Sequence, residues 1–432
     1  MNSPEYRTAA QLAAETRTTG PIHPGCYLHY NGPGSTGFGV KRTAMLMPET
    51  AMLMISPMGC GRSGTVVAEQ YGFAHRMFYL NLDDRSVASG SYLRRIPEAA
   101  RYIAGLGKFR AILLCMSCID ALTGTDLEGI GRTVRRETGL SVATTFMDPI
   151  VRDGNYGPMV QIRQAITSCL EGGPVQADTV NVLGTFAPLA PDSELHQLLS
   201  PAGIRQISTV AGCETFGQLQ KMGQSRCNLV IHPQATACGK DLEKRLNMPW
   251  QQMFTTYCPG QIAREYDALG EFLNITLDYR PFEARARQRM EAFARRRRGS
   301  RIAVGESVCG SPFDIALLLL ALGIQVPFVF RDRLQPWDAP ALAQLAQLAP
   351  DLPIYSGVHP ETARRSEALP RADLALGLDA GYFCPQGVSV AWPWEKAWFG
   401  FEALEALLDL LEDGFDAPKG HREQMKGSYL TV

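Results

Sequence analysis

From about residue 50 onward, the chain alternates short apolar runs with amphipathic segments of helical length. Runs rich in Val, Ile and Leu indicate strands that are buried on both faces, and such strands form parallel sheets covered by helices. This alternation is typical of a doubly wound α/β protein. The expected strands are 51–55, 77–82, 111–115, 141–146, 179–183, 206–210, 229–232, 301–304, 326–330, 353–356, 374–377 and 388–391, and the expected helices include 126–139, 158–171, 238–246, 260–272, 281–297, 311–322 and 395–411.

The length of the chain indicates more than one domain. A chain of 432 residues is too long for one ordinary hydrophobic core. The composition breaks at Gly172-Gly173-Pro174 and again at Arg298-Gly299-Ser300, where a long helical segment ends. We therefore expect three Rossmann-like doubly wound domains around a central cleft, with boundaries at 1–172, 173–298 and 299–432.

Composition excludes several classes of partner and location. The net charge is −1, and a nucleic-acid-binding chain needs a basic excess. The basic run Arg295–Arg298 is interpreted as a solvated helix end. The apolar stretch 317–322 is too short to cross a bilayer, and the first residues lack the apolar core of a signal peptide. We expect a cytoplasmic protein that binds neither nucleic acid nor membrane.

Three cysteines in the first third of the chain stand in loop-like, mostly Gly-rich contexts. Cys26 follows Pro24-Gly25. Cys60 lies between two glycines after the apolar run 51–55, and Cys118 follows the apolar run 111–115. Eleven cysteines without a secretory signal do not indicate a disulfide framework. Thiolates delivered by separate loops are what a large iron–sulfur cluster shared between chains needs. Cys26, Cys60 and Cys118 are therefore candidate metal ligands.

Other interpretations of these segments are weaker. Gly32, Gly34 and Gly37 match G-x-G-x-x-G formally, but no convincing buried strand precedes them, as a dinucleotide site requires. Val40 breaks the Gly-Lys-Ser/Thr of a Walker loop, so the chain itself is not expected to hydrolyse ATP. Cys115 and Cys118 form a C-x-x-C pair, yet Cys115 falls inside a strand and is interpreted as structural. An NAD-dependent enzyme without metal remains an alternative.

Three motifs together resemble the nitrogenase component 1 superfamily, in particular its α-type subunit. They are Gly25-Cys26, the stretch Ser56-Pro-Met-Gly-Cys60-Gly, and the stretch from Cys118 through Gly124-Thr-Asp126-Leu. The resemblance is strong over residues 20–130 and weaker after that. It implies that the three cysteines bind a P-cluster-like 8Fe–7S cluster or a 4Fe–4S cluster at an interface with a sister β-type subunit.

The same resemblance implies partners and neighbouring residues. A separate ATP-dependent iron protein would supply electrons to an α2β2 heterotetramer. Gly59 and Gly61, which flank Cys60, are candidate cofactor-binding residues, and the glycines at 32–37 would suit a backbone loop that wraps closely around a cluster. Arg62 would tune the charge of the cluster, or would instead form a surface or intersubunit salt bridge.

The departures from the family pattern bear on the reaction. The His that holds the catalytic cofactor in true nitrogenases is missing around residues 390–392. Where the cofactor Cys is expected, the chain has His232 and then Cys238. Cys309 follows a strand and opens a helix, where a helix N-terminus favours a thiolate or an anionic ligand.

These residues favour a nitrogenase-like reductase that acts on a small molecule other than dinitrogen. Cys309, His232 and Cys238 are its candidate catalytic residues, with a possible role in holding a second Fe–S-based cofactor. The alternative is a non-catalytic scaffold on which a nitrogenase-type metallocofactor is assembled.

Overall fold

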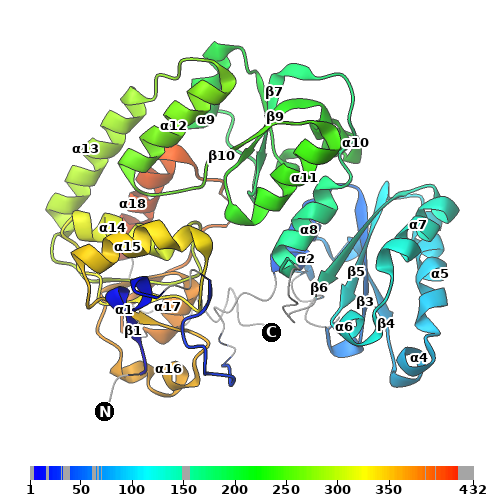
Figure 1. The fold of residues 1–432 in the computed structure, drawn as a ribbon, viewed down its shortest axis with the longest axis horizontal. Coiled ribbons are helices and arrows are strands. Elements are labelled where there is room, and N and C mark those ends of the chain that lie inside the picture. Colours follow the sequence, from blue (N-terminus) through cyan, green and yellow to red (C-terminus); the bar gives the residue numbers. More distant parts are fainter. Residues whose placement is uncertain are drawn as a thin grey trace. The chain divides into compact units, whose positions relative to one another are not determined.

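A computed structural model describes residues 4–15, 19–30, 32, 39–60, 65, 68–69, 71–147, 156–384, 386–394 and 396–416. The chain divides into two compact units. The central unit comprises residues 37–190 and 203–253, and the terminal unit comprises residues 1–36, 191–202 and 254–431. Figure 1 shows helices packed against sheets in each unit. The expected α/β class with parallel sheets is confirmed, whereas the three domain boundaries and the central cleft stay predictions.

The first sheet of the central unit is wholly parallel, with strand order β4–β3–β5–β6. Its two inner strands, β3 (Thr50–Ser56) and β5 (Ala111–Ser117), are buried along their whole length. The outer strands are β4 (Met77–Asn81) and β6 (Ser141–Met147). Continuous burial explains why the inner strands are almost uniformly apolar rather than alternating.

Helices α5 (Tyr92–Gly105) and α7 (Leu127–Thr138) cover this sheet (Figure 1). The Asp126 carboxylate accepts a hydrogen bond from the backbone N–H of Gly129 and so caps α7. Gly131 of α7 lies so close to the sheet that an added Cβ would come within 2.9 Å of the Thr144 methyl group. The core between the layers contains Leu53, Ile55, Ile96, Leu114 and Val134.

The second sheet of the central unit is also parallel, with strand order β10–β9–β7–β8. These strands are β7 (Gln176–Leu183), β8 (Gln206–Ser208), β9 (Ser225–Val230) and β10 (Trp250–Gln252). The strand expected at 229–232 corresponds to β9. In the structure β9 begins four residues earlier than expected, at Ser225, and it ends at Val230, before His232. This strand contains the polar residues Ser225 and Asn228, which are buried and hydrogen-bond to Asn181 of β7.

Asn181 of β7 is the centre of this buried polar group. Its Nδ2 donates to the carbonyl of Met222 at 2.8 Å and to Oδ1 of Asn228 at 2.9 Å, and its Oδ1 accepts from the Ser225 hydroxyl at 2.8 Å. Asn181 and Asn228 are fully buried. Because a buried amide without partners is costly, these bonds fix how β7 and β9 pair.

The terminal unit is built on a six-stranded sheet in which the first strand of the chain lies at one edge. The strand order is β1–β14–β12–β11–β15–β16, and only β1 runs antiparallel. Another early strand, β2, pairs antiparallel with β13. The bounds are β1 (Arg7–Thr8), β2 (Gly20–Pro21), β11 (Ile302–Val304), β12 (Val329–Phe330), β13 (Arg333–Leu334), β14 (Pro353–Tyr355), β15 (Leu374–Leu376) and β16 (Val388–Val390).

Two long helices of the terminal unit, α13 (Arg280–Arg297) and α18 (Gly400–Asp416), are joined by a row of ion pairs. Arg285 pairs with Glu405 at 2.8 Å, and Arg289 pairs with Asp409. Arg296 and Arg297 both pair with Glu412 at 2.7 Å. The run Arg295–Arg298 ends α13 as expected, and the Arg296 side chain is 50% exposed, but Arg296 and Arg297 also pair with the acidic face of α18.

The helix expected at 395–411 begins later than predicted. Glu395 lies outside the described residues, and residues 396–399 are not helical. Gly400, the first residue of α18, has a left-handed backbone with φ of +67°. The carboxylate of Glu194, at the start of α9 (Glu194–Leu199), accepts hydrogen bonds from the N–H groups of Phe401 and Glu402. A carboxylate from a distant segment therefore caps this helix.

The remaining α-helices lie between the strands much as the sequence predicts. No helix within the described ranges is long and apolar enough to span a membrane. The further helices are α1 (Ala9–Ala13), α2 (Gly39–Ala44), α4 (Asp84–Ser89), α6 (Ile119–Thr123), α8 (Pro158–Thr167), α10 (Phe216–Lys221), α11 (Thr236–Leu246), α12 (Pro259–Leu273), α14 (Pro312–Ala321), α15 (Ala339–Leu348), α16 (Pro360–Arg364) and α17 (Leu378–Phe383).

Candidate functional site

Cys60 and Cys118 lie at the same edge of the first sheet. Strands β3 and β5 are parallel neighbours in which Ile55 pairs with Met116, so their carboxyl ends are level. Cys118 directly follows β5 and precedes α6, and Cys60 is the last of the helical residues 58–60 that the structure describes after β3. Both side chains are half-buried, and all eleven cysteines are free of disulfides. The carboxyl edge of a parallel sheet is where open α/β proteins bind ligands.

The loop after Cys118 is anchored from the neighbouring helix. The buried Tyr92 of α5 places its hydroxyl 2.7 Å from the hydroxyl of Thr125 and 3.1 Å from that of Thr123. Gly124 between them has φ of +58°, which favours glycine at this turn. These contacts fix the path of the chain from Cys118 into α7.

A buried lysine lies behind the two strand ends. Lys41 of α2 is almost fully buried, and its ammonium donates to the carbonyl oxygen of Cys60 at 3.3 Å. Burial lowers the pKa of Lys41, and the nearby thiols of Cys115 and Cys60 oppose that shift. Sequence reasoning missed this residue because Val40-Lys41-Arg42 was weighed only as a Walker loop. Nothing in the local sequence shows that this lysine points inward.

Cys115 is buried inside β5, in agreement with its interpretation as structural. Burial raises the pKa of its thiol to about 12. A thiol of that kind does not supply a thiolate at neutral pH. The C-x-x-C pair therefore consists of Cys115, an inert core residue, and Cys118, which lies at the edge of the sheet.

Cys26 belongs to the terminal unit, so the structure describes it separately from Cys60 and Cys118. It lies in a half-buried position after β2, and its thiol donates to the carbonyl of Leu28 at 3.2 Å. Gly59 is exposed beside Cys60. Gly61 and Arg62 lie outside the described residues. The structure thus brings two of the three predicted cluster ligands to one edge and leaves the third in the other unit.

The glycine-rich segment at residues 32–37 has no strand immediately before it. Residues 26–30 are irregular, whereas a dinucleotide fingerprint follows a buried strand. Of the segment itself, Gly34 and Gly37 lie outside the described residues. The described part therefore weighs against the NAD-dependent alternative.

Cys309 lies in the loop between β11 and α14, as the sequence predicts. It is half-buried, and its carbonyl accepts a hydrogen bond from the Tyr257 hydroxyl at 3.1 Å. Gly310 has φ of +86°, and a Cβ at this position would come within 3.0 Å of the Thr255 carbonyl. Ser311 caps α14 through the N–H of Phe313. The loop is thus held closely against the segment that precedes α12.

Buried carboxylates hold the backbone of the Cys309 loop. Asp379 accepts from the N–H groups of Glu306 and Ser307, and Glu306 accepts from the Arg331 guanidinium at 3.0 Å. Arg331 also bonds Asp338 at 2.6 Å. Burial raises the pKa of Glu306 to about 8 and that of Asp379 to about 6. These acids follow parallel strands, but their convergence is a tertiary property that sequence reasoning did not find.

His232 and Cys238 come together in the central unit around one arginine, Arg163 of α8. Burial and the charge of Arg163 lower the pKa of His232 to about 3, and burial raises the pKa of the Cys238 thiol to about 11. The backbone N–H of Gln234 donates to Nδ1 of His232 at 3.2 Å. At neutral pH both side chains are therefore uncharged.

A small cavity of about 20 Å³ lies beside Cys238 and is lined by Arg163, Thr167, Gly184 and Thr185 among others. A space of this size holds about one water molecule. It would have to open before a metallic cofactor entered. Cys309 lies in the other unit, so the three candidate catalytic residues are not described as one group.

A parallel α/β sheet with two half-buried cysteine thiols at its carboxyl edge is typical of the class of α/β proteins that bind a ligand through sulfur. Within that class, the chain belongs to the family of nitrogenase component 1 type oxidoreductases, whose family model matches residues 35–387. This match confirms the resemblance drawn from the cysteine motifs.

Individual relatives agree with that family. The chain is 23% identical over 240 residues to the nitrogenase iron-molybdenum cofactor biosynthesis protein NifE of Klebsiella pneumoniae, covering 50% of this chain and 52% of the relative. It is 25% identical over 284 residues to the nitrogenase molybdenum-iron protein alpha chain of Methanothermobacter thermautotrophicus, covering 62% and 56%. The chain thus spans little more than half the length of these two relatives.

Two broader comparisons cover more of the chain. NifE of Sinorhizobium fredii is 22% identical over 395 residues, covering 86% of this chain and 77% of the relative. The structure named "Nitrogenase Cp1 at pH 6.5" superimposes with a TM-score of 0.72 at 14% identity, covering 89% of this chain and 93% of that chain. At this identity the superposition shows a shared fold.

Proposed function

We propose that the chain is a subunit of an ATP-dependent nitrogenase-like reductase. In this proposal Cys26, Cys60 and Cys118 hold an Fe–S cluster at the seam with a sister β-type subunit of an α2β2 heterotetramer. A separate ATP-dependent iron protein supplies electrons, and a small molecule is reduced at a second site. Family membership supports the reaction class, and the positions of Cys60 and Cys118 at one edge of the first sheet support the cluster.

The observation that carries the proposal is an exposed apolar side chain within four residues of each of the three cysteines. Tyr27 beside Cys26 is 97% exposed, Met58 before Cys60 is 71% exposed, and Leu122 after Cys118 is 81% exposed. Exposed apolar residues gathered at a functional position mark surfaces that a partner covers. A sister subunit over these residues would close the cluster off from water.

The donor set fits an Fe–S cluster. Cys60 and Cys118 are half-buried thiols outside any disulfide on neighbouring loops, and Fe–S clusters are held by Cys thiolates. When bound, such a cluster stores and relays single electrons. Lys41 places a positive charge behind the Cys60 carbonyl, which favours the more negative, reduced form of a group held there.

For the second site we favour Cys309 over Cys238 as the residue that meets a cofactor or substrate. Cys309 is half-buried in a loop held by Tyr257 and Asp379, at the start of α14. Cys238 is buried beside a cavity of one-water size. A rigid loop at a helix N-terminus suits a thiolate or an anionic ligand better than a closed core does.

The test is iron content after anaerobic purification with the co-expressed sister subunit. Cys60→Ala and Cys118→Ala are expected to lower bound iron and bleach the broad visible absorption. Cys258→Ala is the matched control, because Cys258 is free and exposed but follows no predicted cluster motif. Equal iron in Cys60→Ala and in the wild type would refute the ligand assignment.

A second function, a scaffold for assembling a nitrogenase-type metallocofactor, is favoured by the NifE proteins among the relatives. The buried positions of His232 and Cys238 fit this function too. A scaffold binds a cofactor only transiently and does not need these two residues to form a permanent cofactor site. Turnover with a matching iron protein and ATP separates the two functions. A reductase consumes reductant when substrate is added, whereas a scaffold transfers its cofactor to an apo partner without turnover.

A further inference from the structure

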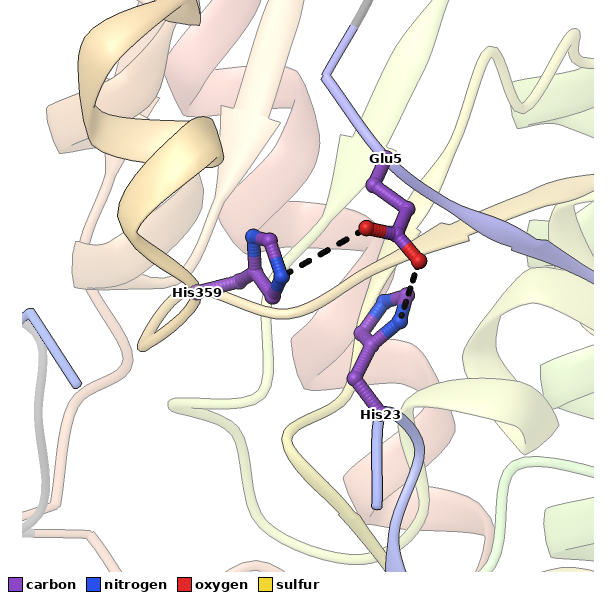
Figure 2. A group of neighbouring side chains, drawn as sticks. All are labelled: Glu5, His23 and His359. Carbon is purple, nitrogen blue, oxygen red and sulfur yellow. Dashed lines mark ion pairs between the residues drawn. The ribbon is translucent and has the colours of Figure 1, made fainter. Parts of the chain in front are cut away.

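Two histidines and a glutamate of the terminal unit face one another, and the carbonyl of one of them, His23, accepts a hydrogen bond from the backbone N–H of Cys26 at 3.1 Å. Glu5 precedes β1, His23 follows β2, and His359 precedes α16 (Figure 2). Glu5 Oε1 lies 3.4 Å from His23 Nδ1, and Glu5 Oε2 lies 3.7 Å from His359 Nε2. One ligand atom from each residue falls within 4.8 Å of the other two.

The histidines are buried, whereas the glutamate is open to solvent. The side chains of His23 and His359 are 8% and 9% exposed, and that of Glu5 is 63% exposed. Nε2 of His23 is buried without a hydrogen-bond partner among the described residues. A buried polar atom without a partner is costly, so this nitrogen has a lone pair or proton to satisfy.

Glu5 and His23 interact through an ion pair and a side-chain hydrogen bond, and the separations within the group also approach those around a metal ion. Most N–H···O hydrogen bonds are about 2.7–3.2 Å long, and both N···O distances are longer than that. Around a tetrahedral zinc ion, with bonds of about 2.0–2.2 Å to nitrogen and oxygen, neighbouring ligand atoms lie about 3.4 Å apart. The three ligand atoms lie within 4.8 Å of one another, so the farthest pair would have to approach by less than about 1.5 Å to reach the spacing around a zinc ion.

We propose that Glu5, His23 and His359 form a binding site for a divalent first-row transition metal of the zinc type. Two imidazoles and one carboxylate are the donor set of catalytic zinc and of non-haem iron sites, with positions left open on the exposed side. The ion would join the start of β1 and the segment after β2 to the loop after β14.

Two neighbours set the strength of this site. Arg7 brings a positive charge near His23, but its guanidinium is held by Glu15 at 2.6 Å and by the carbonyl of Ile22 at 3.3 Å. His359 Nδ1 accepts the backbone N–H of Glu361 at 3.2 Å, which caps α16. Coordination through Nε2 puts the ring proton on Nδ1 and gives up that capping bond, so the site is weaker than its donor set alone implies.

The test is binding of Co²⁺ alone to the full chain, followed by difference absorption spectra and displacement with Zn²⁺. Cobalt at this site gives ligand-field bands without a thiolate-to-cobalt charge-transfer band, which distinguishes it from cobalt bound by cysteines. Glu5→Gln is expected to weaken this cobalt at least about tenfold, and His359→Ala to abolish it. Glu5 is exposed, so its variant does not depend on refolding the core.

His29→Ala is the matched control, because His29 is an exposed histidine in the same segment as His23. It is expected to leave the cobalt spectrum and affinity unchanged. Equal affinity in Glu5→Gln and the wild type, or cobalt that always carries the thiolate band, overturns the proposal. None of these variants changes Cys26, Cys60 or Cys118, and iron content is measured separately, so failure of the cobalt test and failure of the proposed function are distinguishable.

Discussion

Replacing Asn181 by leucine should destabilise the central unit severely. Leucine fills nearly the same space in β7 but removes both the donor and the acceptor of the amide. The Met222 carbonyl, the Asn228 Oδ1 and the Ser225 hydroxyl each lose a partner that lies 2.8–2.9 Å away. All of this happens in a fully buried part of the second sheet.

The magnitude follows from the three orphaned groups. A buried polar group left without a hydrogen bond costs about 1–3 kcal/mol. Some of that cost is offset by the apolar surface that leucine buries, so the expected loss is about 3–5 kcal/mol of unfolding free energy. Typical total stabilities are about 5–15 kcal/mol, and the melting temperature should fall by about 10 °C or more.

The assay is urea and thermal unfolding followed by circular dichroism, with Asn228→Leu as the comparison. Asn228→Leu leaves the bonds of Asn181 to Met222 and Ser225 in place, and it removes an amide nitrogen of Asn228 that has no partner among the described residues. It should therefore cost clearly less than Asn181→Leu. The double variant should cost about 1 kcal/mol less than the sum of the two, because both ends of one bond are removed together.

A loss below 1 kcal/mol in Asn181→Leu would refute the argument that this amide fixes the pairing of β7 and β9. Strict additivity in the double variant would show that Asn181 and Asn228 do not interact in solution.

Three further predictions concern the terminal unit and the sheet edge. Gly400→Ala should cost at least about 3 kcal/mol in thermal unfolding, because φ is +67° and the new Cβ would collide with the Tyr266 hydroxyl; wild-type stability would contradict this. Burial raises the pKa of Glu194 from 4.5 to about 7, so its folded form holds more protons than the unfolded chain between these values and stability falls as pH rises through them. Glu194→Gln removes this pH-dependent contribution. The unfolding free energy of the variant relative to that of the wild type should therefore rise by about 2–3 kcal/mol from pH 5 to pH 8. A difference that does not change with pH would exclude the raised pKa of Glu194. Lys41→Met should lower the midpoint potential of a cluster at Cys60 by on the order of 50–100 mV without loss of iron, as followed by redox titration, and an unchanged potential would place the charge too far away to matter.

The fold was predictable where a strand is buried on both faces. β3 and β5 read as continuous apolar runs, and their predicted bounds agree with the structure within two residues. β9 was misplaced because Ser225 and Asn228 look like loop residues, yet their bonds to Asn181 let them lie inside a sheet. The strands β1 and β2 are two residues long, and only their pairing with distant strands defines them.

The candidate site divides in the same way. Cys60 and Cys118 were recognisable because glycines and apolar runs mark their loops along the sequence. Lys41, Glu306 and Asp379 were not, because their roles come from burial and from partners far away in the chain. Pairing between distant segments cannot be read from the local pattern of one sequence.

The pairing of β1 with β14 has a consequence for the order in which the protein is made. Residues 37–253 leave the ribosome before the strands that Arg7 and Thr8 need as neighbours have been synthesised. The central unit, which contains Cys60 and Cys118, is continuous in sequence except for the segment 191–202, which belongs to the terminal unit. The segment with Cys26 also belongs to the terminal unit and can pack only after its partner strands in the last third of the chain have been made. Any group that requires all three thiols can therefore be inserted only after the late strand β14 has been synthesised.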